Sequence, residues 1–174
     1  MLTVRSSVPE DVPELARLIE QFMHDAFTRP WGGSAEALAR DGFGAHFEMS
    51  VARIADGGLV GFAAWEDIYD LHHCMPGAHV IDLYVAPPHR GIGVALALLA
   101  DVAARVRDRG GRFLRGQALP ARGLEHLYGR VAVLFPGDEC NVGGRAFRAL
   151  ADLAGVPARE AVHKLPEKSW NYEP

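Results

Sequence analysis

The chain has 174 residues, of which 49 % are hydrophobic and 23 % charged, and its formal net charge is −4. This composition is typical of a folded domain in water, and the length predicts one domain over residues 1–174 that needs no disulfide or metal to hold its core. The acidic balance, without a basic stripe, argues against nucleic acid as a partner.

Nothing in the sequence predicts a membrane span or an export signal. Uncharged apolar runs fall short of the roughly 18 residues that a span needs, and the N-terminus lacks a basic segment followed by an apolar one. The two cysteines, Cys74 and Cys140, do not make a disulfide framework and suit a reducing compartment. We therefore expect a cytoplasmic location and no membrane partner.

Hydrophobic periodicity and turn residues predict the elements of the first half of the chain. Apolar residues recur every three or four positions from Leu15 to Met23, as on one face of a helix. Gly57 and Gly58 favour a tight turn between two segments rich in strand-forming residues. In chain order, we expect a strand at 2–5, a helix starting at residue 14, a capped helix at 34–40, strands at 47–55 and 59–65, an irregular loop at 66–78 and a strand at 79–85.

Prolines and glycines also divide the second half. Pro87 and Pro88 cannot donate to a sheet and end the strand at 79–85, and Gly110 with Gly111 stops the long apolar segment that follows. In chain order, we expect a helix at 91–109, a strand at 112–118, a helix at 121–129, a strand at 131–135, a helix at 144–154 and a strand at 160–165. This order predicts a mixed α/β fold in which hairpins lead into a strand–helix–strand crossover.

A short basic loop with two glycines joins the strand at 79–85 to the long helix. The first N–H groups of a helix have no partner within it and lie at the positive end of its dipole. Gly91 and Gly93 would let a ligand approach these groups, and Arg90 adds a positive charge. These features suit a pyrophosphate, although an ordinary strand-to-helix turn is the alternative interpretation. The Walker and dinucleotide-binding patterns are both absent.

The loop reads Arg-x-x-Gly-x-Ala and lies within the string IDLYVAPPHRGIGVALALL. This string resembles the GNAT acyltransferase superfamily, and the resemblance covers roughly residues 2–130. It implies an α/β GNAT fold with a central, mostly antiparallel twisted sheet, flanking helices and a splayed pair formed by the fourth and fifth strands. It also implies acetyl-coenzyme A as the cofactor, with the loop amides on its pyrophosphate and the Val85 N–H as oxyanion donor. The coenzyme-binding set that it implies is Leu83, Tyr84, Val85, Arg90, Gly91, Ile92, Gly93, Val94 and Ala95.

Acetyl transfer to an amine requires that the amine lose a proton. Asp82 is the only carboxylate within the strand at 79–85, and strict alternation places it on the face opposite Leu83 and Val85. We interpret it as a base acting through water or as an anchor for a cationic amine, and a structural aspartate is the alternative. The surrounding run resembles the diamine and polyamine acetyltransferases, which carry Glu-Asp at this point, whereas this chain has Ile81 before its aspartate.

A second catalytic candidate lies near residue 128. The segment Leu127-Tyr128-Gly129 resembles the helix end from which, in this family, a tyrosine protonates the coenzyme thiolate. The resemblance implies that role for Tyr128, and a core tyrosine is the alternative. The family's usual asparagine is Ala121 here, so the pantetheine contacts are expected to differ.

The acceptor is less well determined by the sequence. Trp31 is a candidate wall of its pocket, and Glu66, Asp67 and Asp70 are candidates for an acidic acceptor site, with a loop anchor and a solvated charged loop as the alternatives. The histidines between residues 72 and 79 lack metal-ligand spacing, so no metal site is predicted. They could instead line the pocket or act as a base.

A small polyamine-like or amino-acid-like amine is the expected substrate. A protein amine and an aminoglycoside remain open as acceptors, and so does a non-catalytic coenzyme-binding sensor. The resemblance implies a homodimer.

Overall fold

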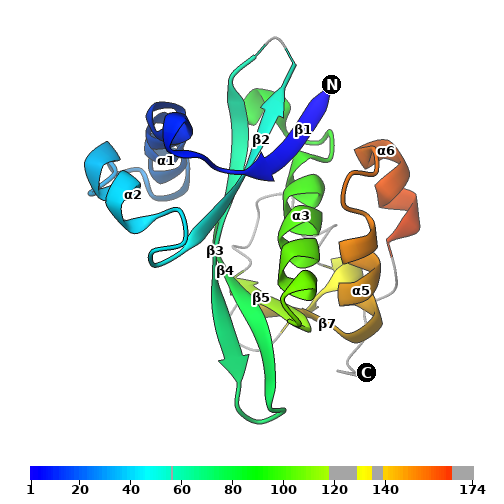
Figure 1. The fold of residues 1–174 in the computed structure, drawn as a ribbon. Helices are drawn as coiled ribbons and strands as arrows, with labels where there is room; N and C mark the ends of the chain where they lie inside the picture. The colour runs from blue at the N-terminus through cyan, green and yellow to red at the C-terminus, as the bar shows by residue number, and fades with distance from the viewer. Residues whose placement is uncertain (56, 118–128, 135–138, 166–174) are drawn as a thin grey trace.

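The described residues of the computed structural model, 1–55, 57–117, 129–134 and 139–165, form a seven-stranded sheet with helices on both faces (Figure 1). Helices α1 and α2 cover one face, and α3, α5 and α6 cover the other. The strands are β1 (Leu2–Ser6), β2 (Glu48–Ile54), β3 (Leu59–Asp70), β4 (Met75–Val85), β5 (Phe113–Gln117), β6 (Val133–Leu134) and β7 (Glu139–Gly143). The helices are α1 (Val12–Phe27), α2 (Ala35–Asp41), α3 (Val94–Asp108), α5 (Gly144–Asp152) and α6 (Ala158–Ala161).

The strand order is β1-β2-β3-β4-β5-β7-β6, and the sheet is mostly antiparallel. Strands β4 and β5 run parallel, and α3 makes the crossover between them. Their pairing covers only three positions, from Ala78 with Leu114 to Val80 with Gly116. Because β4 continues to Val85, its last residues diverge from β5. The mixed α/β fold and the splayed β4–β5 pair are therefore confirmed.

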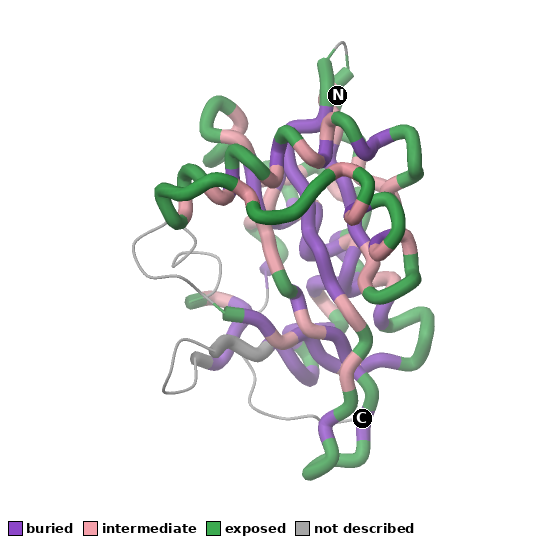
Figure 2. Tube along the Cα trace, turned by 90° about the vertical axis from the view of Figure 1, so that its left-hand side faces the viewer, coloured by how far each residue is buried: buried purple, intermediate pink, exposed green. Residues whose placement is uncertain are grey.

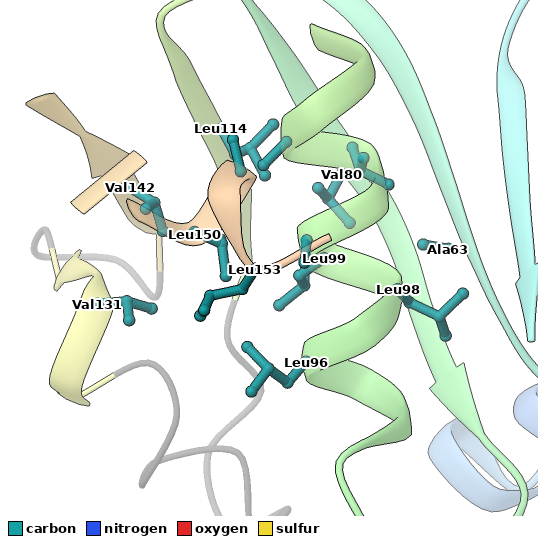
Figure 3. Close-up of a cluster of buried hydrophobic side chains, with 14 of the residues drawn as sticks. Ala63, Val80, Leu96, Leu98, Leu99, Leu114, Val131, Val142, Leu150 and Leu153 are labelled. Atoms are coloured by element: carbon teal, nitrogen blue, oxygen red, sulfur yellow. The ribbon is translucent and has the colours of Figure 1, made fainter. Parts of the chain in front are cut away.

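Two apolar clusters hold the helices against the sheet. On one face, α3 lies between the sheet and α5, so eight of its residues are buried and it is apolar on more than one side. Figure 3 shows this cluster, in which Leu98 and Leu99 of α3 lie among side chains of β3, β4, β5 and α5. On the other face, Leu15 and Leu18 of α1 pack against Phe62 of β3. Figure 2 shows the buried strands passing between exposed helical surfaces.

Polar contacts fix the two long helices, just before the start of α1 and near the middle of α3. The buried Asp11 carboxylate, just before α1, accepts two hydrogen bonds from the Arg5 guanidinium at 2.6 and 2.8 Å and one from the Val8 N–H at 2.9 Å. In α3, Asp101 accepts from the buried Ser50 hydroxyl of β2 at 2.7 Å. Buried polar groups of this kind are stable because their partners replace the lost water.

The structure corrects the sequence-based prediction at two places. Residues 66–78 are not an irregular loop, because β3 extends to Asp70 and pairs with β4 down to Met75. The segment 160–165 is not a strand, because α6 and a 3-10 turn at Val162–Lys164 occupy it. Strand β7 was not expected at all. The helix predicted at 121–129 lies mostly outside the described residues.

Candidate active site

The carboxyl end of β4 presents a backbone N–H that the sheet does not use. Ala86 donates its N–H to the Val60 carbonyl at 2.9 Å, so these two residues form a hydrogen-bonded pair. Such pairs alternate with non-bonded ones in an antiparallel ladder, and the next pair is Val85 with Gly61. The Val85 N–H therefore points away from β3, toward the side on which β5 has diverged.

The loop after β4 opens the first turn of α3 to a ligand. Gly91 and Gly93 have φ angles of +75° and +88°, which favour glycine, and Gly93 is the N-cap of α3. The first backbone hydrogen bond of this helix runs from the Ala97 N–H to the Gly93 carbonyl, at 3.0 Å. The preceding N–H groups thus lie at the positive helix end without an intrahelical acceptor.

The Arg90 side chain points back toward the protein rather than adding a free charge to the loop. Its Nε donates to the Val85 carbonyl at 2.8 Å, and its guanidinium pairs with Asp25 of α1 at 3.1 Å. Asp25 also accepts from the Tyr84 hydroxyl at 2.9 Å, and the Arg90 guanidinium lies 5.6 Å from the centre of the Tyr84 ring. Burial and the hydrogen bond to Asp25 raise the pKa of Tyr84 to about 12. These contacts tie the loop to α1 and keep the phenol protonated.

Residues 155–165 form a second wall beside the loop. A Cβ atom on Gly93 would lie 2.0 Å from the Cβ of Ala158, so α6 packs directly on the loop. Ala161 and Leu165 are buried in the core next to α3 and hold this wall in place. With the end of β4 and the first turn of α3, it lines a cleft of about 2170 Å³, into which Arg130 and Arg159 also face.

Asp82 lies where this cleft meets a smaller pocket. The ladder pairs Ala64 with Asp82 and Trp65 with Val80, which leaves Ile81 as the extra residue of a β-bulge. Asp82 lines both the cleft and the pocket of about 280 Å³ on the α1–α2 face. Burial raises the pKa of the Asp82 carboxyl to about 6, although His79 opposes this rise.

The smaller pocket is mostly apolar, and Trp31, the predicted wall of the acceptor pocket, is among its lining residues. The Trp31 indole packs on Gly33, where an added Cβ would lie 2.7 Å from the ring, and the backbone N–H of Trp31 donates to the Glu20 carboxylate at 3.1 Å. The pocket is lined by Ile19, Trp31, Ala37, Leu38, Asp41, Phe47, Met49, Phe62, Ala64, Ile81 and Asp82.

The three other acidic candidates lie elsewhere. Glu66, Asp67 and Asp70 belong to the β3–β4 hairpin, and none of them lines the cleft or the pocket. Glu66 lies 3.3 Å from His79, and Asp67 lies 3.6 Å from Arg109. Asp70 is buried and accepts the N–H groups of residues 72 and 73 at the hairpin turn. Each of these carboxylates therefore has a local partner within the hairpin or beside it.

Tyr128 and Ala121 lie outside the described residues. Within the described ranges, no three His, Cys, Asp or Glu side chains are placed to hold a metal ion, and no helix is long and apolar enough to cross a membrane. Sequence reasoning missed Asp25, Phe47 and the 155–165 wall. For the helical wall of the pocket, the sequence offered one signal, the apolar periodicity of the helix that contains Ile19.

Comparison with known proteins identifies the family. The model of the acetyltransferase (GNAT) family matches residues 16–130. A ribosomal-protein-alanine N-acetyltransferase from Brucella melitensis biovar Abortus 2308 is 28 % identical, with a TM-score of 0.65 over 78 % of this chain and 94 % of that one. An aminoglycoside acetyltransferase from an uncultured soil metagenomic sample is 25 % identical, with a TM-score of 0.54 over 70 % of this chain and 82 % of that one.

Another metagenomic aminoglycoside acetyltransferase, in complex with sisomicin, shares the fold at 18 % identity and a TM-score of 0.62, over 74 % of this chain and 84 % of that one. A search of the curated proteins finds no match. The predicted closeness to polyamine acetyltransferases is not confirmed by these relatives. From the family match and the shared fold, the chain belongs to the GNAT family and is an N-acetyltransferase.

Proposed function

We propose that this enzyme moves an acetyl group from acetyl-coenzyme A to the primary amine of a small acceptor, by direct attack of the amine. The observation that carries the proposal is the position of Asp82, a carboxylate at the point where a large cleft meets a small pocket. The cleft suits the donor and the pocket suits the acceptor. The amine would then lie between them, beside the carboxylate.

The residues of the cleft fit the coenzyme. Unpartnered N–H groups at the start of α3 suit a pyrophosphate, and Gly91 leaves the backbone of the loop accessible, since nothing lies within 4 Å of a Cβ built on it. Arg159 and Arg130 supply positive charge on the opposite wall. When bound, acetyl-coenzyme A supplies the activated thioester. Gly91, Ile92, Gly93, Val94 and Ala95 would hold its phosphates, and Arg90 would position the loop.

The Val85 N–H is the proposed donor to the thioester oxygen as negative charge develops there. It points into the gap between β4 and β5, away from any partner on β3. A backbone donor fixed by a sheet needs no reorganisation during the reaction, and one such donor is worth about 3–4 kcal/mol of barrier. Leu83 has the same backbone orientation, two residues earlier in the ladder.

Asp82 is the proposed anchor and base for the amine. Moving a proton from an ammonium of pKa about 10 to an ordinary aspartate of pKa about 4 is uphill by about 8 kcal/mol. The pKa of about 6 at Asp82 reduces this cost to about 5 kcal/mol. Tyr128, outside the described residues, is proposed from the family resemblance to return a proton to the departing thiolate. A cytoplasmic location and a homodimer stay predictions.

Two measurements together test the proposal. Calorimetry should show that coenzyme A binds the purified protein, and a thiol-reactive dye should show that thiol release from acetyl-coenzyme A depends on added amine. A broad panel of primary amines is the substrate set, and buffer alone is the control for hydrolysis. Coenzyme binding without amine-dependent release for any member would refute the transferase proposal.

A further inference from the structure

The acceptor pocket is built from aromatic and aliphatic side chains. Trp31 and Phe47 form its walls, and Met49, Phe62 and Ala64 form its floor on the sheet. The side chains of Met49, Phe62 and Ala64 belong to the buried cluster beneath α1 and α2. Such a surface favours a ligand that covers it with apolar area, because both apolar surfaces are then removed from water.

The walls are held in place before any ligand binds. The Trp31 ring lies on Gly33, and its backbone N–H is held by Glu20. The Phe47 ring lies 3.5 Å from the position of a Cβ on Gly42. Fixed aromatic walls lose little conformational freedom on binding, so they favour a rigid apolar ligand.

The pocket offers one free negative charge. Two carboxylates line it, Asp41 and Asp82. Asp41 accepts two short hydrogen bonds from the Arg40 guanidinium, at 2.6 and 2.5 Å, so its charge is already balanced. No hydrogen bond or ion pair with a described residue satisfies Asp82. A half-buried carboxylate without a partner favours a cation at that position.

From this arrangement we infer that the acceptor is a small monoamine with an apolar, ring-bearing body. This inference rests on the proposed function, because it takes the amine to lie beside Asp82. The single free carboxylate pairs with one ammonium, and the aromatic walls enclose the body. A polyamine would leave its second ammonium against apolar side chains, and an aminoglycoside would leave its many hydroxyl and amino groups without partners. Both cases cost binding energy.

Substrate selectivity of the wild-type enzyme is the test. We expect kcat/KM for 2-phenylethylamine to exceed the values for putrescine, sisomicin and an alanyl peptide at least about tenfold, the discrimination that an apolar pocket can reach. The Trp31→Ala variant should raise KM for 2-phenylethylamine about tenfold and change kcat less. Tyr69→Ala, which removes an exposed aromatic ring on the β3–β4 hairpin, is the matched control and should leave both constants unchanged.

Preference for putrescine, sisomicin or the peptide would overturn the inference and leave the transferase proposal standing. Absence of thiol release with every amine would refute the transferase proposal instead. In that case, thermal shifts with coenzyme A present still test the inference. Stabilisation by 2-phenylethylamine and not by putrescine supports it, and the reverse contradicts it.

Discussion

Replacing Asp82 with asparagine removes the one uncompensated carboxylate at the junction of the cleft and the pocket. The rise of its pKa from 3.8 to about 6 corresponds to at most about 3 kcal/mol of penalty for holding the ionised group. Partial contact with solvent reduces this to about 1–2 kcal/mol. At pH 7 the Asp82→Asn variant should therefore be more stable than the wild type, with Tm higher by roughly 2–8 °C.

The raised pKa of Asp82 determines how the stability of the wild type depends on pH. Because the folded-state pKa lies above the unfolded one, the folded protein holds this proton more tightly between pH 3.8 and about 6. The contribution of Asp82 to stability is greatest below this window and is lost as the pH rises through it. The Asp82→Asn variant should lack that loss, which denaturant titrations at pH 5 and pH 7 will measure.

The Asp82→Asn variant should be less active than the wild type, although it is more stable. In the wild type, kcat/KM should rise as the pH rises through about 6, where Asp82 ionises, and then level off. Without this carboxylate, the variant reacts only with amine that is already deprotonated in solution, so its kcat/KM should rise about tenfold per pH unit across the neutral range. At pH 7 the loss should be about 10²–10⁴-fold. A variant that is less stable, or equally active with an unchanged profile, would refute this account of Asp82.

Three further substitutions test the site and the scaffold. Gly93→Ala should weaken coenzyme A binding at least about tenfold, because φ of +88° and the contact with Ala158 both oppose a Cβ. The control is Gly110→Ala, which has a similar φ of +85° but open space around it and should cost only about 1 kcal/mol of stability. Equal affinities of the two variants for coenzyme A, measured by calorimetry, would contradict this. Asp11→Asn should lower the free energy of unfolding by about 1–3 kcal/mol at pH 7 and by less at pH 3. The Arg5 hydrogen bond lowers the pKa of Asp11, so the carboxylate's contribution to stability disappears as the pH falls through that lowered pKa. Urea titrations at both pH values check this, and an equal loss of stability at both would refute it. Tyr128→Phe should lower kcat with Tm unchanged, and an unchanged kcat would remove its acid role.

Local signals in the sequence correctly predicted the strand end, the glycine loop and the helix start between β4 and α3. The prolines end β4, the two glycines adopt positive φ angles, and the long helix begins at Val94. Each of these features depends on neighbouring residues alone. That is why the strand, the loop and the helix could be predicted together, and why the resemblance carried by the same string identified the family.

Long-range contacts explain what the sequence did not show. Residues 66–78 contain aspartates, histidines, proline and glycine, which are poor strand formers, yet pairing across the ladder carries the hairpin through them. Gly77 lies where a Cβ would be 2.4 Å from the Phe113 ring, so its presence reflects packing against β5. Asp25 is 59 residues away from Tyr84, the residue that it holds, and no local pattern reports such a contact.

The segment after residue 130 illustrates the same limit. We expected a strand at 160–165, but Pro157 begins a helical turn, and Ala161 and Leu165 are buried against α3. The short distance between Ala158 and the loop follows from that packing. Composition alone does not distinguish an apolar helical turn from a short strand.

The central claim is that an amine held at Asp82 receives the acetyl group of the coenzyme. Mass spectrometry of a reaction between 2-phenylethylamine and isotope-labelled acetyl-coenzyme A tests it directly. The account predicts one labelled N-acetyl product for each free thiol formed, with both greatly reduced in the Asp82→Asn variant at pH 7. Thiol released without acetylated amine, or an equal yield from that variant, would contradict it.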